Sequence, residues 1–242
     1  MKNAFLIAGR ELGSYLRTPS GYIIAAAMLA WQALMLNGYA FRDDAQNSTE
    51  NLIRFLEIAG GTAIVTAALF SLRLLAEERS TGTQTLLFTS PVKEGEIVAG
   101  KYLSSLIFLV IVIALSLYMP ALIQMKGKVS WGHIGAGYLG IFLLGASTLA
   151  LGMLASSLVK HPFLAVILTL VFVALLFVAF FVGAQVDGPL GELIIYFSQF
   201  HGHYRPSFVE GLIRLSDIVF FVTLSYVCLM AATRVLKGQR WR

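Results

Sequence analysis

The chain has 242 residues and a mass of 26.4 kDa; 57% of the residues are hydrophobic and only 13% are charged. Soluble globular proteins carry about 25% charged residues, so this composition excludes an ordinary soluble fold. The net charge of +5 comes from scattered basic residues, so no nucleic-acid partner is expected. The single cysteine, Cys228, excludes an internal disulfide.

Six apolar stretches predict an all-α polytopic membrane protein with six transmembrane helices. They cover residues 21–41, 53–75, 102–124, 133–158, 163–183 and 217–236. Together they leave no room for a catalytic domain outside the bilayer. The second stretch contains the pair Gly60 and Gly61, and the fourth is rich in Gly, Ala and Ser. Small residues of this kind suit close packing between helices in lipid.

The distribution of basic residues predicts the orientation. If the N-terminus is cytoplasmic, six of the 18 Lys and Arg residues lie in outer segments and the other 12 lie in inner ones. The outer six are Arg42, Arg54, Lys126, Lys128, Arg205 and Arg214. The positive-inside rule favours this orientation, which places both termini in the cytoplasm.

Residues 1–18 predict a helix that lies in the inner membrane interface. Apolar side chains share one face and polar or basic side chains share the other, and the segment ends before Pro19. The apolar face holds Phe5, Ala8, Leu12, Tyr15 and Leu16, and the other face holds Lys2, Arg10, Ser14 and Arg17. The alternative is an ordinary first turn that leads into the first span.

Residues 77–101 form the longest polar stretch on the predicted inner side. Within it, the apolar cluster Leu86, Leu87 and Phe88 lies between Thr83 and Pro91. A compact apolar cluster at the end of a polar loop must be buried against something. We expect it either to fold back on the membrane surface or to dock into a partner protein.

Residues 184–216 predict two short outer helices that dip into the membrane before the last span. The first has apolar residues at helical spacing, but the run is too short to cross a bilayer. These residues are Leu190, Leu193, Ile194, Phe197 and Phe200. Ser207 and Glu210 have the spacing of a capping box, which predicts that a second helix begins at Ser207. The alternative is a surface loop with incidental periodicity.

Motifs for chemistry are weak in this chain, and we expect no catalytic residue, cofactor or metal. Residues 95–101 have the GxxxxGK skeleton of a phosphate-binding loop, but Tyr102 replaces the required Ser or Thr and no strand precedes it. Ser147 has no histidine at membrane depth to activate it. His201 and His203 lack an evident third metal ligand.

The segment 77–92, continued by residues 96–101, resembles the loop between spans two and three of ABC-2 type transporter permeases. The N-terminal residues resemble those of the gliding-motility-associated branch of that family. They are Glu11-Leu12, Ser14-Tyr15, Pro19 and Gly21-Tyr22-Ile23. The resemblance covers essentially the whole chain. One departure is Thr85, which stands where the family often has Glu.

The resemblance implies one permease domain over residues 1–242, with the architecture of ABC-2 (type V) exporters, in a prokaryotic inner membrane. Such a permease has no ATPase activity of its own. It exports a substrate by binding two copies of a cytoplasmic ATP-binding subunit, and it pairs with a second permease chain. That second chain is either identical or a different protein with a large outer domain.

The resemblance also implies site residues. The loop 77–101 would be the coupling segment that contacts the ATP-binding subunit, and residues 1–18 would be the connecting helix beside it. The coupling residues are Glu77, Glu78, Arg79, Gly82, Thr83, Gln84, Leu86, Leu87, Phe88 and Pro91, and the connecting helix contributes Phe5, Arg10, Leu12 and Tyr15.

A second hypothesis belongs to a different class. The chain would be a membrane anchor that delivers ATP-driven motion to an outer partner without moving a solute. The two hypotheses differ in the surface between the paired permeases, which must be polar or adaptable in a conduit but can be sealed by apolar packing in an anchor.

Overall fold

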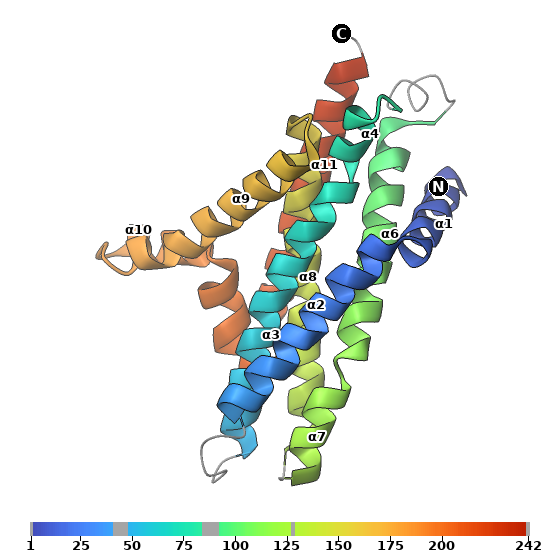
Figure 1. The fold of residues 1–242 in the computed structure, drawn as a ribbon. Coiled ribbons are helices and arrows are strands. Elements are labelled where there is room, and N and C mark those ends of the chain that lie inside the picture. The colour runs from blue at the N-terminus through green and yellow to red at the C-terminus, as the bar shows by residue number, and fades with distance from the viewer. Residues whose placement is uncertain (1, 41–47, 84–91, 127–128, 241–242) are drawn as a thin grey trace.

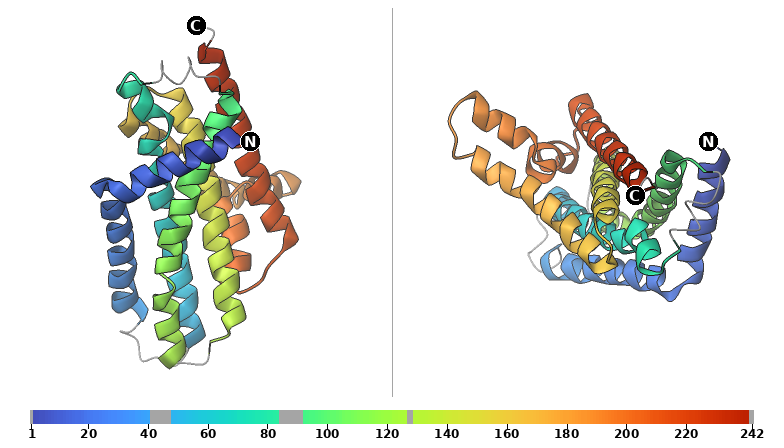
Figure 2. Two further views of the ribbon diagram at one scale, coloured as in Figure 1. Left: turned by 90° about the vertical axis from the view of Figure 1, so that its right-hand side faces the viewer. Right: turned by 90° about the horizontal axis from the view of Figure 1, so that it is seen from above.

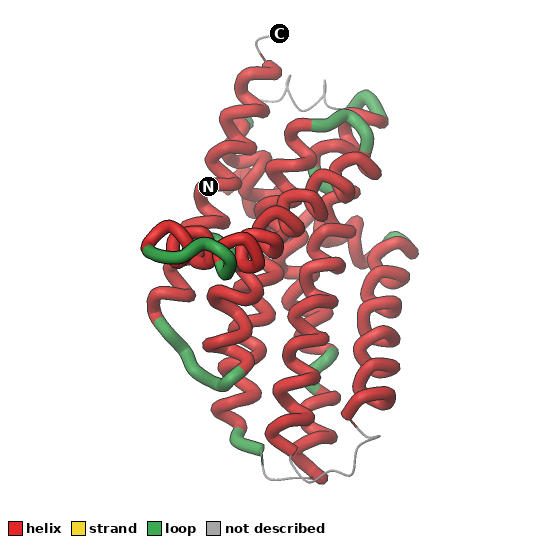
Figure 3. The backbone as a smooth tube through the Cα atoms, turned by 90° about the vertical axis from the view of Figure 1, so that its left-hand side faces the viewer, coloured by secondary structure: helices red, strands yellow, loops and turns green. Residues whose placement is uncertain are grey.

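The computed structural model describes residues 2–40, 48–83, 92–126 and 129–240, and helix makes up almost all of this part of the chain (Figures 1 and 3). The α-helices are α1 (Lys2–Arg17), α2 (Pro19–Met35), α3 (Ser48–Phe70), α4 (Leu75–Ser80), α6 (Glu94–Leu115), α7 (Tyr118–Lys126), α8 (Trp131–Leu158), α9 (Pro162–Gly183), α10 (Pro189–Tyr196) and α11 (Leu215–Arg240). Between them lie the π-helices η1 (Leu36–Ala40) and η3 (Gln199–Val209) and the 3-10 turn η2 (Ser71–Arg73).

Within the described residues, six segments are long and apolar enough to cross a membrane, which confirms the predicted all-α polytopic architecture. They are Pro19–Gly38, Ser48–Ser80, Glu94–Met125, Trp131–Leu158, Pro162–Gly183 and Leu215–Gln239. The third begins at Glu94 rather than near residue 102, because the polar residues before Tyr102 are helical as well. The GxxxxGK skeleton therefore lies in the first two turns of α6 and forms no loop.

Helix α8 is the centre of the bundle, and α9 lies at its edge. Within the most apolar window of each, 83% of α8 is buried but only 11% of α9. Helix α8 packs against α3, α9, α11, α6 and η3. Figure 2 shows α9 and α10 projecting from one side of the molecule, with α1 on the opposite side.

Glycines on α8 allow its neighbours to approach closely, as the composition of the fourth span predicts. A Cβ atom added at Gly137 would lie 2.5 Å from a methyl carbon of Leu56, and one at Gly145 would lie 2.9 Å from Leu109. These glycines therefore serve as contact surfaces for side chains of α3 and α6.

The segment after α9 forms two short helices, as predicted, but the second does not begin at Ser207. That helix, η3, ends two residues later at Val209. Its buried rings decide its position: Tyr204 packs against Gly60 of α3, and Phe208 packs against Gly140 of α8. The Tyr204 hydroxyl donates to the Leu56 carbonyl oxygen at 2.6 Å. Tertiary packing of aromatic rings thus overrides the local capping signal.

The adjacent glycines of α3 have opposite surroundings, which generates a stability prediction. A Cβ at Gly60 would lie 2.4 Å from the Tyr204 ring, whereas a Cβ at Gly61 would meet nothing within 4 Å. We expect Gly60→Leu to cost about 1–3 kcal/mol or more through overpacking, and Gly61→Leu to leave stability unchanged. Thermal unfolding of the two purified variants in detergent checks this, and equal melting temperatures would contradict the placement of Tyr204.

Candidate functional site

Several helices that are distant in the sequence meet at one end of the bundle. Helix α4, the first turns of α6 and the end of α11 lie together at the top of Figure 1, with α1 beside α6. The end of α8 also reaches this region, where it contacts α4. We call this group of α1, α4, the first two turns of α6 and the ends of α8 and α11 the junction.

Helix α4 is capped by a side chain from α8. The chain breaks at Leu74, whose backbone angles are φ −79° and ψ −114°, and α4 begins in a new direction. The backbone N–H groups of Leu75 and Ala76 both donate to Ser156 Oγ, at 2.9 and 2.8 Å. The first N–H groups of a helix have no partner within it, so Ser156 satisfies donors that burial would otherwise leave unpaired.

Arg79 fastens the other end of α4 to the same helix. Its guanidinium donates to the carbonyl oxygens of Ser157, at 2.7 Å, and Val159, at 2.9 Å, and also to the Gln239 side chain near the end of α11. Terminal carbonyls of a helix lack partners and carry partial negative charge, so a cation is favourable there. Arg79 therefore connects α4 directly to the end of α8, just before the turn into α9.

Lys101 joins α4 to α1 and α6. Its side chain is 4% exposed, and its amine lies 3.0 Å from a carboxylate oxygen of Glu78 and 3.6 Å from one of Glu11. Arg10 donates to the Glu11 carboxylate at 2.9 Å, so that the cluster holds two cations and two carboxylates. A buried amine is tolerated only because it is paired, and the pairing fixes the positions of three helices.

Arg73 joins the end of the second span to the turn between α1 and α2. Its guanidinium donates to the hydroxyl oxygens of Thr18, Ser20 and Ser14, at 2.6, 3.1 and 3.0 Å. It lies 3.7 Å from Glu77 and 4.7 Å from the centre of the Tyr15 ring. Ser14 is thus turned toward the protein, although the sequence placed it on the polar face with Arg17.

The buried Tyr15 ring anchors α1 in the bundle. It stacks on Phe108 of α6 at 5.3 Å between ring centres, and its hydroxyl is 2.9 Å from Ser105 Oγ. Burial raises the pKa of Tyr15 to about 12, so this group is neutral. In contrast, Phe5 and Leu16 remain exposed. The predicted helix is confirmed, and its apolar face divides between the bundle and the surroundings.

The predicted coupling residues fall into two groups. Glu78 and Arg79 face inward, Glu77 is partly buried beside Arg73, and Gly82 and Thr83 lie in the turn after α4, where Gly82 has a φ of +73°. The others, Gln84, Leu86, Leu87, Phe88 and Pro91, lie outside the described residues. In the connecting helix, Arg10 is exposed and Leu12 is partly buried.

Sequence reasoning missed Glu11, Lys101 and Ser156 as members of the junction. A usable signal was present for Lys101, since a lysine beside a strongly apolar stretch needs a buried partner. The identity of that partner was not readable, because Glu11 and Glu78 are distant from Lys101 in the sequence.

The two histidines of the short outer helices have separate surroundings. His203 is buried and contacts Asp217, at 2.8 Å from Nδ1, and the Tyr196 carbonyl oxygen, at 2.8 Å from Nε2. His201 instead packs against Phe177 and other phenylalanine rings. In the described part of the chain, no three His, Cys, Asp or Glu side chains are grouped to hold a metal ion.

In the described part of the chain, six apolar spans, of which the glycine-rich α8 is the most buried, define a multi-pass helical membrane protein with paired charges at one end. The chain belongs to the ABC-2 family of transporter proteins, because the sequence model of that family matches residues 22–233. It is therefore a membrane subunit of an ABC transporter, which associates with an ATP-binding subunit, rather than an enzyme in itself. No curated protein matches the chain.

Removal of the buried amine tests the junction. We expect Lys101→Met to lower the free energy of unfolding by about 3–5 kcal/mol, because Glu11 and Glu78 would lose their shared cation. The double variant Lys101→Met/Glu78→Gln should recover part of the stability. Denaturation in detergent measures all three proteins, and a single variant as stable as the parent would contradict the pairing.

Proposed function

We propose that the chain is the permease subunit of an exporter, which couples ATP hydrolysis by a separate cytoplasmic ATP-binding subunit to movement of a substrate. The observation that carries this proposal is the attachment of α4. This helix directly precedes residues 84–91, and it is tied to α8 by Ser156 and Arg79 and to α6 and α1 by Lys101. A push on the loop therefore reaches three parts of the bundle.

In this mechanism the coupling residues divide their roles. Leu86, Leu87 and Phe88 form the apolar contact with the ATP-binding subunit, and Gly82 supplies the turn that leads to them. Glu78 and Arg79 hold the segment from the membrane side, because their charged groups are engaged within the chain. The ATP-binding subunit thus pushes on residues 84–91, and the preceding helix α4 is held to α8 by hydrogen bonds.

The assembly that we propose contains two copies of the ATP-binding subunit and a second permease chain in a prokaryotic inner membrane, with both termini cytoplasmic. The second chain is either a copy of this one or a gliding-type partner with a large outer domain. The exposed surface of α9 offers an apolar area for that chain, since α9 contributes little to the core of its own bundle.

One observation favours a second candidate, in which the chain transmits force to an outer partner without moving a solute. The exposed side chains of α9 are apolar from Phe163 to Val182. A second permease packed on this surface would seal the interface rather than line a polar conduit.

Placing a charged side chain at Leu87 tests the contact with the ATP-binding subunit. We expect Leu87→Asp to abolish copurification with the ATP-binding subunit, because a carboxylate cannot enter an apolar pocket without a partner. The matched control is Leu212→Asp, which places the same change at an exposed position in the loop before α11. Unchanged copurification of the Leu87 variant would refute the coupling role.

The orientation is tested by labelling single cysteines in a Cys228→Ser background. We expect Ala45→Cys to react with a membrane-impermeant maleimide added to intact cells, and Thr81→Cys to react only after the cells are opened. Mass-tag gel shifts measure both reactions. The opposite pattern would place the termini outside.

A further inference from the structure

A buried histidine and a buried aspartate link the short outer helices to the last span. His203 lies in η3 and is 3% exposed, and Asp217 lies in the first turn of α11 and is 4% exposed. The distance from His203 Nδ1 to Asp217 Oδ1 is 2.8 Å. The other ring nitrogen, Nε2, lies 2.8 Å from the carbonyl oxygen of Tyr196, the last residue of α10. The imidazole therefore bridges three elements, α10, η3 and α11.

These two contacts determine how many protons the pair must hold. A carbonyl oxygen can only accept a hydrogen bond, so Nε2 of His203 must carry a proton. A neutral imidazole has one N–H group, so Nδ1 would then present a lone pair to the carboxylate of Asp217. This contact is a hydrogen bond only if one more proton is present, either on Nδ1 or on the carboxyl group. That proton belongs to the pair rather than to either residue.

The other neutral tautomer of His203 does not remove the conflict. With its single proton on Nδ1, the imidazole donates to Asp217, but the lone pair of Nε2 then faces the carbonyl oxygen of Tyr196. Loss of the extra proton therefore breaks one of the two contacts in either tautomer.

The surroundings of the pair favour the extra proton. Phe220 stacks on the His203 ring with 3.9 Å between ring centres, and an aromatic face attracts a cation. Asp217 Oδ2 is buried, and among the described residues it has no hydrogen-bond partner. Because a buried carboxylate is costly without compensation, a proton on the carboxyl group or a positive charge on the imidazole offsets this cost.

Other titratable groups around η3 have contacts of their own. Glu57 of α3 accepts from Arg205 at 2.6 Å, and His133 of α8 lies 2.7 Å from the carbonyl oxygen of Val209. Helix α9 carries no titratable side chain. The rest are Tyr138 bonded to Ser116, Tyr204 bonded to Leu56, His201 among phenylalanine rings, and the exposed Glu192, Glu210 and Arg214.

The position of Asp217 gives protons access to the pair. Residues 212–216 are exposed, and Asp217 directly follows them at the start of the last span. A local opening of the first turn of α11 thus suffices for exchange of a proton with the surroundings. The same helix ends at the junction, where Gln239 accepts from Arg79.

We propose that His203 and Asp217 form a proton-binding site that acts as a pH-sensitive latch between the short outer helices and the last span. With the proton bound, the pair holds η3 to α10 and α11. Without it, one contact becomes repulsive and the first turn of α11 separates from η3. The closed latch holds one proton more than the open one, so the latch opens as the pH rises. This inference does not depend on ATP coupling or export.

The test follows the proton and the contact in one pH titration of the purified full chain in nanodiscs. Histidines labelled with the heavy nitrogen isotope report by NMR which ring nitrogens carry protons, and the signal missing from His203→Gln identifies His203. An infrared band of a carboxylic acid that is absent from Asp217→Asn reports a proton on Asp217. Hydrogen–deuterium exchange of residues 196–217 reports whether the latch is closed.

We expect exchange in residues 196–217 to rise about tenfold or more over that of Asp217→Asn at the same pH, as the pair loses its proton. This factor corresponds to the loss of one hydrogen bond to a charged group. Asp217→Asn is the decisive variant, because its amide N–H can donate to unprotonated Nδ1 of His203 while Nε2 still donates to Tyr196. It keeps both contacts without the extra proton, so its exchange should follow only the intrinsic effect of pH.

Matched variants keep the result interpretable. Glu57→Gln removes the carboxylate of the other ion pair of η3, with Arg205, and should keep the pH response of the parent. If Asp217→Asn does not fold, His203→Gln replaces it, because the two N–H groups of a glutamine amide can bridge Tyr196 and Asp217 without a titrating ring.

Three results would overturn the inference. The same pH course of exchange in the parent, Asp217→Asn and Glu57→Gln would show that the pair does not control the contact. Loss of the proton without a rise in exchange would make the pair a structural contact that does not open. A proton retained at every pH at which the chain stays folded would exclude a switch.

Discussion

Three cations at the junction join helices that are distant in the sequence: Lys101 is buried, and Arg73 and Arg79 are partly buried. Because an unpaired buried charge is costly, each cation fixes the positions of all the groups around it. Arg79 holds α4 to the last carbonyls of α8, and Lys101 holds α4 to α1 and α6. These contacts attach the short helix α4 to α1, α6 and α8.

Helix α8 connects the junction to the short outer helix η3 nearer the other end of the bundle. The same helix that receives Arg79 at one end accepts Phe208 of η3 at Gly140, nearer its other end. Among the six spans of the described residues, α8 is the most buried. The short outer helix η3 therefore packs on the same helix that carries the junction at its other end.

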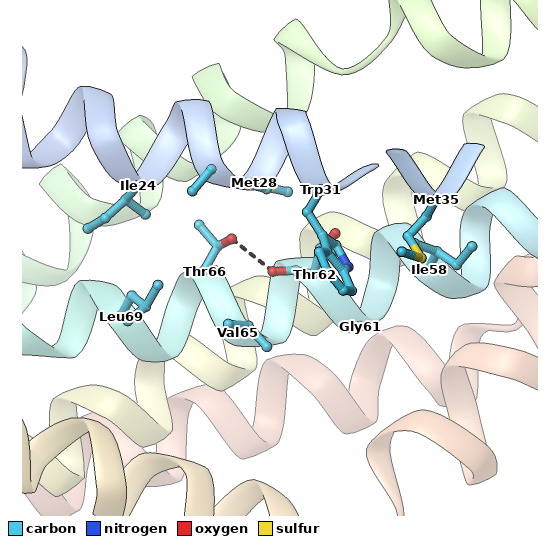
Figure 4. Close-up of a pocket in the computed structure, with 11 residues that line it drawn as sticks. Ile24, Met28, Trp31, Met35, Ile58, Gly61, Thr62, Val65, Thr66 and Leu69 are labelled. Atoms are coloured by element: carbon cyan, nitrogen blue, oxygen red, sulfur yellow. Dashed lines mark hydrogen bonds between the residues drawn. The ribbon is translucent and has the colours of Figure 1, made fainter. Parts of the chain in front are cut away.

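The surfaces that remain uncovered are apolar. Helix α9 exposes apolar side chains along most of its length, and a hollow between α2 and α3 is lined almost entirely by apolar side chains (Figure 4). In a membrane, contact between apolar surfaces gains little over contact with lipid, so shape complementarity decides which partner binds.

The number of spans and the all-α class were predictable from the sequence, because the length of an apolar run is a local property that the bilayer thickness converts directly into a helix. The helix over residues 2–17 and the close packing of the glycine-rich fourth span were also predictable from local pattern. Local pattern failed at Ser207, where the insertion of Tyr204 and Phe208 beside glycines of α3 and α8 determined the course of the chain.

Only the tertiary structure decided that Glu78 and Arg79 face inward, that α8 is central and that Gly60 and Gly61 have opposite surroundings. These features depend on contacts between residues far apart in the chain, such as Lys101 with Glu11, and a linear pattern does not encode which distant group comes to lie opposite.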